Sequence, residues 1–154
     1  MAAGAMIAVE HEAAADDRAI AEAVVGRFLA LWNTHRMEQL GAILTAEAHW
    51  VNTVGMHWAG RDQVVAAHIA FHQGMFKTVG LRLEAVESAI RVADAVVTAV
   101  CRMAVDGFKT PTGDRPPSRD RLTLVLARED GAWRIAHGAN VPIFEQAQAH
   151  NPVG

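Results

Sequence analysis

The sequence predicts an α+β fold in which helices of the N-terminal half pack on one curved antiparallel or mixed β-sheet. Segments with helical spacing of apolar residues come first, over residues 16–35, 37–44 and 61–76. Short alternating segments joined by turn residues dominate the second half, which is typical of hairpins and not of parallel α/β folds. The expected strands cover residues 48–53, 56–58, 79–92, 95–106, 121–128 and 133–140.

The chain is long enough for one domain with a real core. It has 154 residues, of which 51% are hydrophobic and 20% charged. The formal net charge of -3 excludes the basic face that nucleic acids or anionic membranes require. No apolar run approaches the roughly 20 residues that span a bilayer, and we see no signal peptide, so a cytoplasmic location is expected.

The first helix is predicted from capping residues and apolar spacing. Asp16 and Asp17 favour a helix start. The residues before them lack periodicity, so we expect a disordered tail over 1–15, a domain over 16–143 and a second tail over 144–154. The apolar positions of the helix share one face: Ile20, Val24, Phe28, Leu31 and Trp32.

The strands of the second half carry signals of their own. A slip in the alternation between Leu83 and Val86 predicts a bulge, and Asp130-Gly131 predicts a hairpin turn. Residues 95–106 are apolar on both faces, so we expect a second copy to cover the outer one and form a homodimer. The segment Asp106–Arg119 is rich in glycine and proline, and we expect a mobile rim with Phe108 near a cavity mouth.

Four segments resemble the SnoaL-like branch of the nuclear-transport-factor-two-like superfamily, which includes the ketosteroid isomerases. They read FLALWNTH, HWVNTVG, AAHIAFHQGMF and LVLAREDGAWRIAHGAN. The resemblance covers residues 16–143, and the subgroup it suggests is the SgcJ/EcaC-type found in natural-product gene clusters. It implies a cone-shaped sheet wrapped around the helices and a pocket. The same fold hosts isomerases, cyclases, dehydratases, hydrolases and non-catalytic assembly domains.

Two histidines on the third helix are the candidate catalytic residues. His68 and His72 lie one turn apart within an apolar arc that also holds Phe71 and Met75. Buried imidazoles need partners, so these two are either core histidines bonded to the backbone or water, or part of a ligand-facing wall. Their i, i+4 spacing also suits zinc, but the Glu of H-E-x-x-H is replaced and we expect no metal.

Other polar and aromatic side chains on apolar elements complete the candidate site. Asn140 ends the last strand, and His137 shares its phase with Trp133 and Ile135. The two asparagines, Asn52 and Asn140, either bind ligand or cap turns. The full set of expected ligand-binding residues is Trp50, Asn52, His57, Trp58, Phe71, Met75, Phe108, His137 and Asn140.

Absent residue types narrow the chemistry. The chain has no tyrosine, and no Asp is expected on an apolar face of the last two strands, which disfavours the steroid-isomerase constellation of Asp and Tyr. We therefore expect histidine to act as the general acid or base. Without G-x-G-x-x-G we expect no dinucleotide, and no other cofactor.

The resulting expectation is a protein that binds a small apolar aromatic or polyketide-like molecule. It catalyses cofactor-free isomerisation, cyclisation, dehydration or oxidation in natural-product metabolism, or it is a non-catalytic ligand-binding or accessory protein, or a dimeric assembly domain. Neither a nucleic acid nor a membrane is an expected partner.

Overall fold

A computed structural model describes the backbone of residues 2–154 and the side chains from Asp16 onward. The N-terminal half holds α1 (Ala2–Asn33), the 3-10 helix η1 (Met37–Ile43), strands β1 (Leu44–Val51) and β2 (His57–Ala59), and α2 (Arg61–Gln73). The other elements follow: β3 (Leu81–Ala93), β4 (Val96–Val105), β5 (Phe108–Thr110), β6 (Gly113–Arg115), β7 (Ser118–Glu129), β8 (Ala132–Pro142) and α3 (Glu145–Gln148). The predicted α+β class is confirmed.

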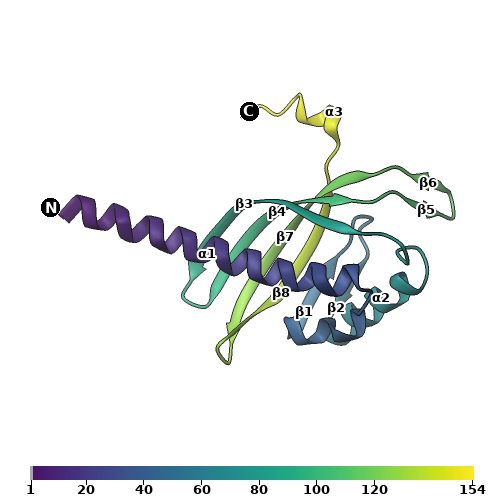
Figure 1. The fold of residues 1–154 in the computed structure, drawn as a ribbon, viewed down its shortest axis with the longest axis horizontal. Helices are drawn as coiled ribbons and strands as arrows, with labels where there is room; N and C mark the ends of the chain where they lie inside the picture. The colour runs from purple at the N-terminus through teal and green to yellow at the C-terminus, as the bar shows by residue number, and fades with distance from the viewer. Residues whose placement is uncertain (1) are drawn as a thin grey trace.

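One mixed sheet carries the fold. Its six strands lie in the order β2-β1-β8-β7-β4-β3, and all neighbours are antiparallel except β1 and β8, which are parallel. Figure 1 shows α1 running across one face of the curved sheet, with η1 and α2 beside β1 and β2. The space between α1, α2 and the sheet is where a site can form. None of the helices in the described chain combines the length and apolar character needed to cross a membrane.

The first helix is longer than the sequence predicted. It begins at Ala2 and not near Asp16, because the alanine-rich start has high helix propensity and does not need the aspartates as a cap. The side chains of the first fifteen residues, where the tail was expected, lie outside the described ones. At its other end α1 is tied to β3, since Trp32 Nε1 donates to the Val79 carbonyl at 2.8 Å and Asn33 exchanges hydrogen bonds with Leu81.

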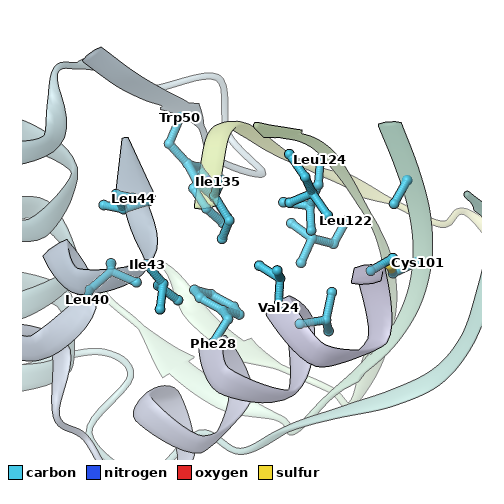
Figure 2. Close-up of a cluster of buried hydrophobic side chains, with 14 of the residues drawn as sticks. Val24, Phe28, Leu40, Ile43, Leu44, Trp50, Cys101, Leu122, Leu124 and Ile135 are labelled. Carbon is cyan, nitrogen blue, oxygen red and sulfur yellow. The ribbon is translucent and has the colours of Figure 1, made fainter. Parts of the chain in front are cut away.

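The core lies between α1 and the inner face of the sheet. Figure 2 shows Val24 and Phe28 of α1 pointing toward Leu122 and Leu124 of β7 and Ile135 of β8. The alternation predicted for β4 is confirmed, because Val97, Ala99, Cys101 and Met103 are all buried. Burial raises the pKa of the Cys101 thiol to about 11, so this cysteine is a packing residue and not a nucleophile.

Five register shifts shape the sheet, three between β3 and β4, one between β1 and β8 and one between β7 and β8, and two of them bear on the sequence predictions. The predicted one is confirmed, since the register of β3 against β4 shifts between Leu83 and Ala85. A second bulge in β8 was not predicted: Leu126 pairs with Ile135, but the neighbouring Val125 pairs with His137. The extra residue, Ala136, reverses which face of the sheet the next side chains occupy.

The segment after β4 is more ordered than a rim loop. Instead of an irregular stretch over Asp106–Arg119, the chain forms the β5–β6 hairpin, and β7 begins at Ser118. Gly113 has a φ of +137°, a conformation that L side chains rarely adopt, and it closes the turn. The Asp130-Gly131 turn is confirmed, with positive φ at both residues.

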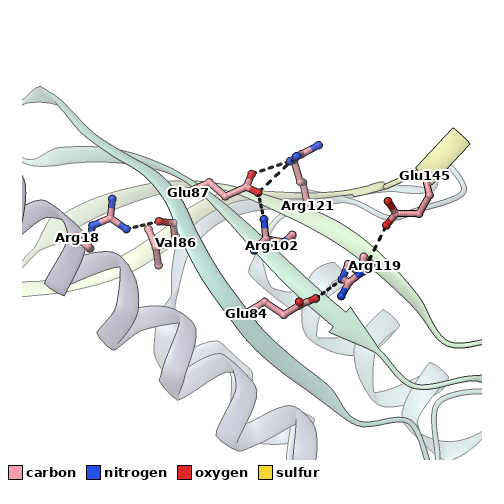
Figure 3. A network of polar contacts seen from close by, with 8 residues as sticks. All are labelled: Arg18, Glu84, Val86, Glu87, Arg102, Arg119, Arg121 and Glu145. Carbon is pink, nitrogen blue, oxygen red and sulfur yellow. Dashed lines mark hydrogen bonds and ion pairs between the residues drawn. The ribbon is translucent and has the colours of Figure 1, made fainter. Parts of the chain in front are cut away.

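The outer face of the sheet carries an ion-pair network. Glu87 accepts from Arg102 at 3.0 Å and from Arg121 at 2.8 Å, and Arg119 donates to Glu84 and reaches Glu145 of α3 (Figure 3). On the opposite side of β3, Arg18 donates to the Val86 carbonyl and so joins α1 to the sheet.

Candidate functional site

An aromatic cavity opens between α1, α2 and the inner face of the sheet. Its volume is about 80 Å³. Every phenylalanine and tryptophan of the chain lines it except Trp133 and Phe144. Trp32 and Phe76 lie with ring centroids 5.3 Å apart, and Phe108 meets Phe76 edge-on at 5.2 Å. Such a wall suits a flat apolar ligand, because aromatic rings stack or meet edge-on with favourable geometry.

His68 is the imidazole that faces this cavity. Four aromatic rings surround it edge-on, those of Phe28, Trp32, Trp50 and Trp58. Its Nδ1 donates to the Val64 carbonyl one turn earlier, at 2.8 Å, which leaves the lone pair on Nε2. Burial lowers the pKa of His68 from 6.5 to about 4, and the bond to Val64 only partly opposes this. The ring is therefore neutral at pH 7 and presents a hydrogen-bond acceptor.

Two asparagines present donors to the same space. Asn52 Oδ1 accepts from the backbone N–H groups of Val54 and Met56, and Asn140 Oδ1 accepts from Trp50 Nε1 at 2.8 Å. These bonds fix which way each amide points, so the amino groups are the ends left for a ligand. Asn52 thus caps its turn, as one of the two alternatives expected, and it also lines the cavity, while ligand binding by Asn52 stays a prediction.

Trp50 owes its position to Gly138. A Cβ at position 138 would lie 2.5 Å from the Trp50 ring, so only glycine lets the indole lie flat against β8. The indole also stacks on Phe28, with centroids 5.5 Å apart. The position of Trp50 in the cavity floor therefore depends on the absence of a side chain at Gly138.

Asp120 is the residue that the sequence interpretation missed. We expected no Asp on an apolar face of the last two strands, but β7 starts at Ser118, and Asp120 shares the buried phase of Leu122, Leu124 and Leu126. It is 8% exposed and lines the cavity. Burial raises its pKa above the usual value, against the opposing charge of Arg115. Extending the apolar alternation of residues 122–126 back by one step would have placed Asp120 on the buried face.

His72 lies next to the cavity wall and not in it. Its Nδ1 is 2.9 Å from Nδ1 of the exposed His35, and its ring meets Trp32 edge-on at 4.3 Å. Among the described residues, His72 Nε2 is the one buried side-chain nitrogen or oxygen without a hydrogen-bond partner. Burial and the neighbouring His35 and His68 lower its pKa to about 4.

The β8 bulge moves His137 to the other face of the sheet. We expected it in phase with Ile135, but the extra residue places Ile135 and Gly138 in the core and leaves His137 outside. There its Nδ1 lies 3.2 Å from that of His49, whose ring is 5.6 Å from the ring of His57. Burial lowers the pKa of His137, helped by His49.

Most of the other expected ligand-binding residues do line the cavity. They are Trp50, Asn52, Trp58, Phe71, Phe108 and Asn140. Met75 is half-buried in the turn after α2 and lies outside the cavity wall. His57 of β2 and His137 of β8 also lie outside the wall. From Asp16 to the C-terminus, no three His, Cys, Asp or Glu side chains are grouped so as to hold a metal ion.

Comparisons with known proteins place the chain in a family. A SnoaL-like domain model matches residues 21–142. An uncharacterized protein with a cystatin-like fold from Caulobacter vibrioides is 35% identical, with a TM-score of 0.85, and the match covers 90% of this chain and 97% of that one. No curated protein matches the sequence.

More distant solved structures share the fold. A ketosteroid isomerase-like protein from Erwinia carotovora atroseptica has 17% identity and a TM-score of 0.68 over 83% of this chain and 97% of that one. An NTF2-like protein with a cystatin-like fold from Novosphingobium aromaticivorans has 16% identity and a TM-score of 0.68 over 94% and 92%. The SgcJ/EcaC-type subgroup stays a prediction. With the family model matching most of its length, the chain belongs to the SnoaL-like domain family.

Proposed function

We propose that this protein binds a small planar aromatic or polyketide-like ketone in the aromatic cavity and moves a proton on it without a cofactor. The observation that carries the proposal is the buried carboxyl of Asp120 in a wall of aromatic rings, together with donor and acceptor groups that have free ends. Burial raises the pKa of this carboxyl, and titratable groups with perturbed pKa values in a cleft are typical of active sites.

Each polar group then has one task. The Asp120 carboxylate takes a proton from the carbon next to the ligand carbonyl, and burial makes it a stronger base than an exposed aspartate. Asn52 and Asn140 donate through their amino groups to the enolate oxygen that forms. Return of the same proton to another carbon completes an isomerisation, and no oxidant is needed. His68 Nε2 accepts a hydrogen bond from a ligand hydroxyl and orients it.

This assignment shifts the acid–base role toward Asp120. His72 does not line the cavity but contacts the ring of Trp32, which does. We therefore propose that His72 holds the Trp32 ring in place and does not touch the ligand. Both His68→Phe and His72→Phe should fold, and only the first should weaken ligand binding. An assembly-only role is less favoured, because such a domain would fill the cavity with side chains.

The test uses 2-tetralone, a bicyclic ketone with acidic α-protons. The wild-type protein should accelerate exchange of these protons for deuterium in D2O, followed by NMR. Asp120→Asn should lower the protein-catalysed rate on the order of a hundredfold or more, while quenching of tryptophan fluorescence still reports binding. Asp114→Asn, at an exposed position of β6, is the matched control and should change neither.

The outcomes separate the candidate functions. Binding without any acceleration of exchange by the wild-type protein would favour the non-catalytic carrier. Full exchange activity in Asp120→Asn would remove Asp120 from the proposal. The absence of both binding and exchange would reject the cavity as a ketone site.

We propose that the protein is a homodimer joined through the outer face of the sheet. The support is a strip of half-buried side chains that includes Val100, Val125 and Ala139, next to charges of both signs at Glu87 and Arg121. A two-fold axis can bring such a patch against itself. Light scattering at micromolar concentration should give twice 16.6 kDa, and a monomer mass would reject the dimer. Location in the cytoplasm and a role in natural-product metabolism stay predictions.

A further inference from the structure

The cavity mouth is built by the β5–β6 hairpin. Phe108 and Arg115 are directly opposite each other in its two strands, and both line the cavity. In Figure 1 the hairpin continues beyond the end of the six-stranded sheet. One aromatic residue, Phe108, and one exposed arginine, Arg115, therefore border the cavity together on a single short element.

The base of this hairpin is tightly packed. A Cβ at Gly107 would lie 2.9 Å from the Arg115 carbonyl oxygen and 3.1 Å from Pro117 Cδ, so the incoming and outgoing chains touch here. The Phe108 ring rests edge-on against Phe76 of the cavity wall. The backbone position of Arg115 at the mouth is thus set by contacts of the wall itself.

Among the described side chains, Arg115 lacks the charge partner that most arginines of the strands have. Arg128, the other strand arginine without a carboxylate partner in the chain from Asp16 onward, lies over the Trp133 ring. Arg82, Arg91, Arg102, Arg119, Arg121 and Arg134 each pair with a carboxylate. For Arg115, no ion pair or side-chain hydrogen bond is found in the part of the chain from Asp16 onward. Its charge does reach the cavity, because it opposes the rise in the pKa of Asp120. Ser118, which also lines the mouth, adds a hydroxyl.

We propose that the natural ligand is an aromatic carboxylate whose carboxylate binds Arg115 and Ser118 at the mouth while its ring system lies in the aromatic cavity. The inference rests on the proposed ligand-binding function and names its substrate class. A guanidinium presents a planar fork that matches a carboxylate with two parallel hydrogen bonds. A neutral ligand covering the mouth would instead remove water from Arg115 and leave it unpaired, which is costly.

The strand geometry sets the size of this ligand. Ser118 and Asp120 are two residues apart on the same face of β7, which corresponds to about 7 Å along the strand. One or two fused rings fit between a carboxylate at Ser118 and a reacting carbon at Asp120.

The test compares matched probes, 2-naphthoate against 2-naphthamide and benzoate against benzamide. Their affinities for the full chain are measured by quenching of the cavity tryptophans at low ionic strength. The wild-type protein should bind each carboxylate about tenfold or more tightly than its amide. Arg115→Gln should lose this preference because only carboxylate binding weakens. Its affinity for each amide should stay within about twofold of that of the wild-type protein. Arg36→Gln, an exposed arginine outside the cavity, is the control and should keep the preference.

Each other outcome counts against a defined claim. Equal binding of carboxylate and amide by the wild-type protein would overturn the substrate class and leave the cavity proposal intact. Equal loss of both probes in Arg115→Gln would make Arg115 a structural part of the mouth and would also overturn the inference. If the wild-type protein bound none of the four probes, the aromatic-cavity function would fail together with it.

Discussion

The polar side chains on the two sides of the sheet differ in how completely they are hydrogen-bonded within the protein. On the outer face Glu87 is bonded to both Arg102 and Arg121, so each charge has a partner. On the inner side, Asn140 of β8 and His68 of the covering helix α2 each use one end in a bond to the protein and leave the other end toward the cavity. Polar side chains that are held in place but still have a free donor or acceptor can bind a ligand. Fully paired surface charges keep the protein soluble and fix the register of the strands. The difference therefore points to the inner face as the functional one.

The largest expected effect on stability comes from the buried histidines of α2 at acid pH. In the unfolded chain His68 and His72 take up protons near pH 6.5, but in the folded protein only near pH 4. The unfolded state thus binds more protons in this window, so the free energy of unfolding falls as the pH falls. Between pH 7 and pH 5 the loss is about 2 kcal/mol for each imidazole.

Urea unfolding at a series of pH values measures this loss. His68→Phe should remove about 2 kcal/mol of the loss between pH 7 and pH 5, while His150→Phe in the exposed C-terminal segment should keep all of the loss. Asp120 acts in the opposite direction at the acid end, because its raised pKa lets the folded state hold a proton more strongly. An unchanged slope in His68→Phe would show that this imidazole is not held neutral by burial.

A second, smaller effect is expected where the cavity floor meets β8. In Gly138→Ala the new methyl group would overlap the Trp50 ring, and overpacking of this kind costs about 1–3 kcal/mol. The control is Gly26→Ala inside α1, where no atom lies within 4 Å of the new Cβ. That variant should instead gain about 0.5–1 kcal/mol from helix propensity. Equal effects of the two substitutions in urea unfolding would mean that Trp50 can move, and that the floor is not rigid.

Much of the fold was predictable because its signals are local and repeated. The alternation of Val97, Ala99, Cys101 and Met103 identifies an inner and an outer face from the sequence alone, and the structure keeps both. The hairpin at Asp130-Gly131 is equally local, because few residues tolerate positive φ. The early start of α1 was missed because the alanine-rich segment has high helix propensity but no helical spacing of large apolar residues to reveal it.

The site was predictable only in part. His68 was identified because it interrupts an apolar helix face, but the same reasoning could not separate it from His72, since which of the two reaches a cavity depends on tertiary packing. His137 was misplaced by a single extra residue at Ala136, which reverses the strand phase and has no clear sequence mark. Asp120 was missed because the predicted strand began at Arg121, three residues after the observed start of β7 at Ser118.

The smallest expected effect lies on the outer face and completes the comparison. Glu87→Gln removes one charge from a network with Arg102 and Arg121 that is partly open to solvent (Figure 3). Pairs of this kind contribute about 0–1 kcal/mol, so the free energy of unfolding should fall by less than about 1 kcal/mol. The loss should shrink further in 1 M NaCl, where the screening length is about 3 Å. Glu47→Gln serves as the control, since no ion pair of Glu47 is found among the side chains from Asp16 onward. The small loss is expected if the network lies at the rim of the proposed dimer interface, whereas a loss well above 1 kcal/mol that persists in high salt would show that the second copy covers the network and excludes water from it.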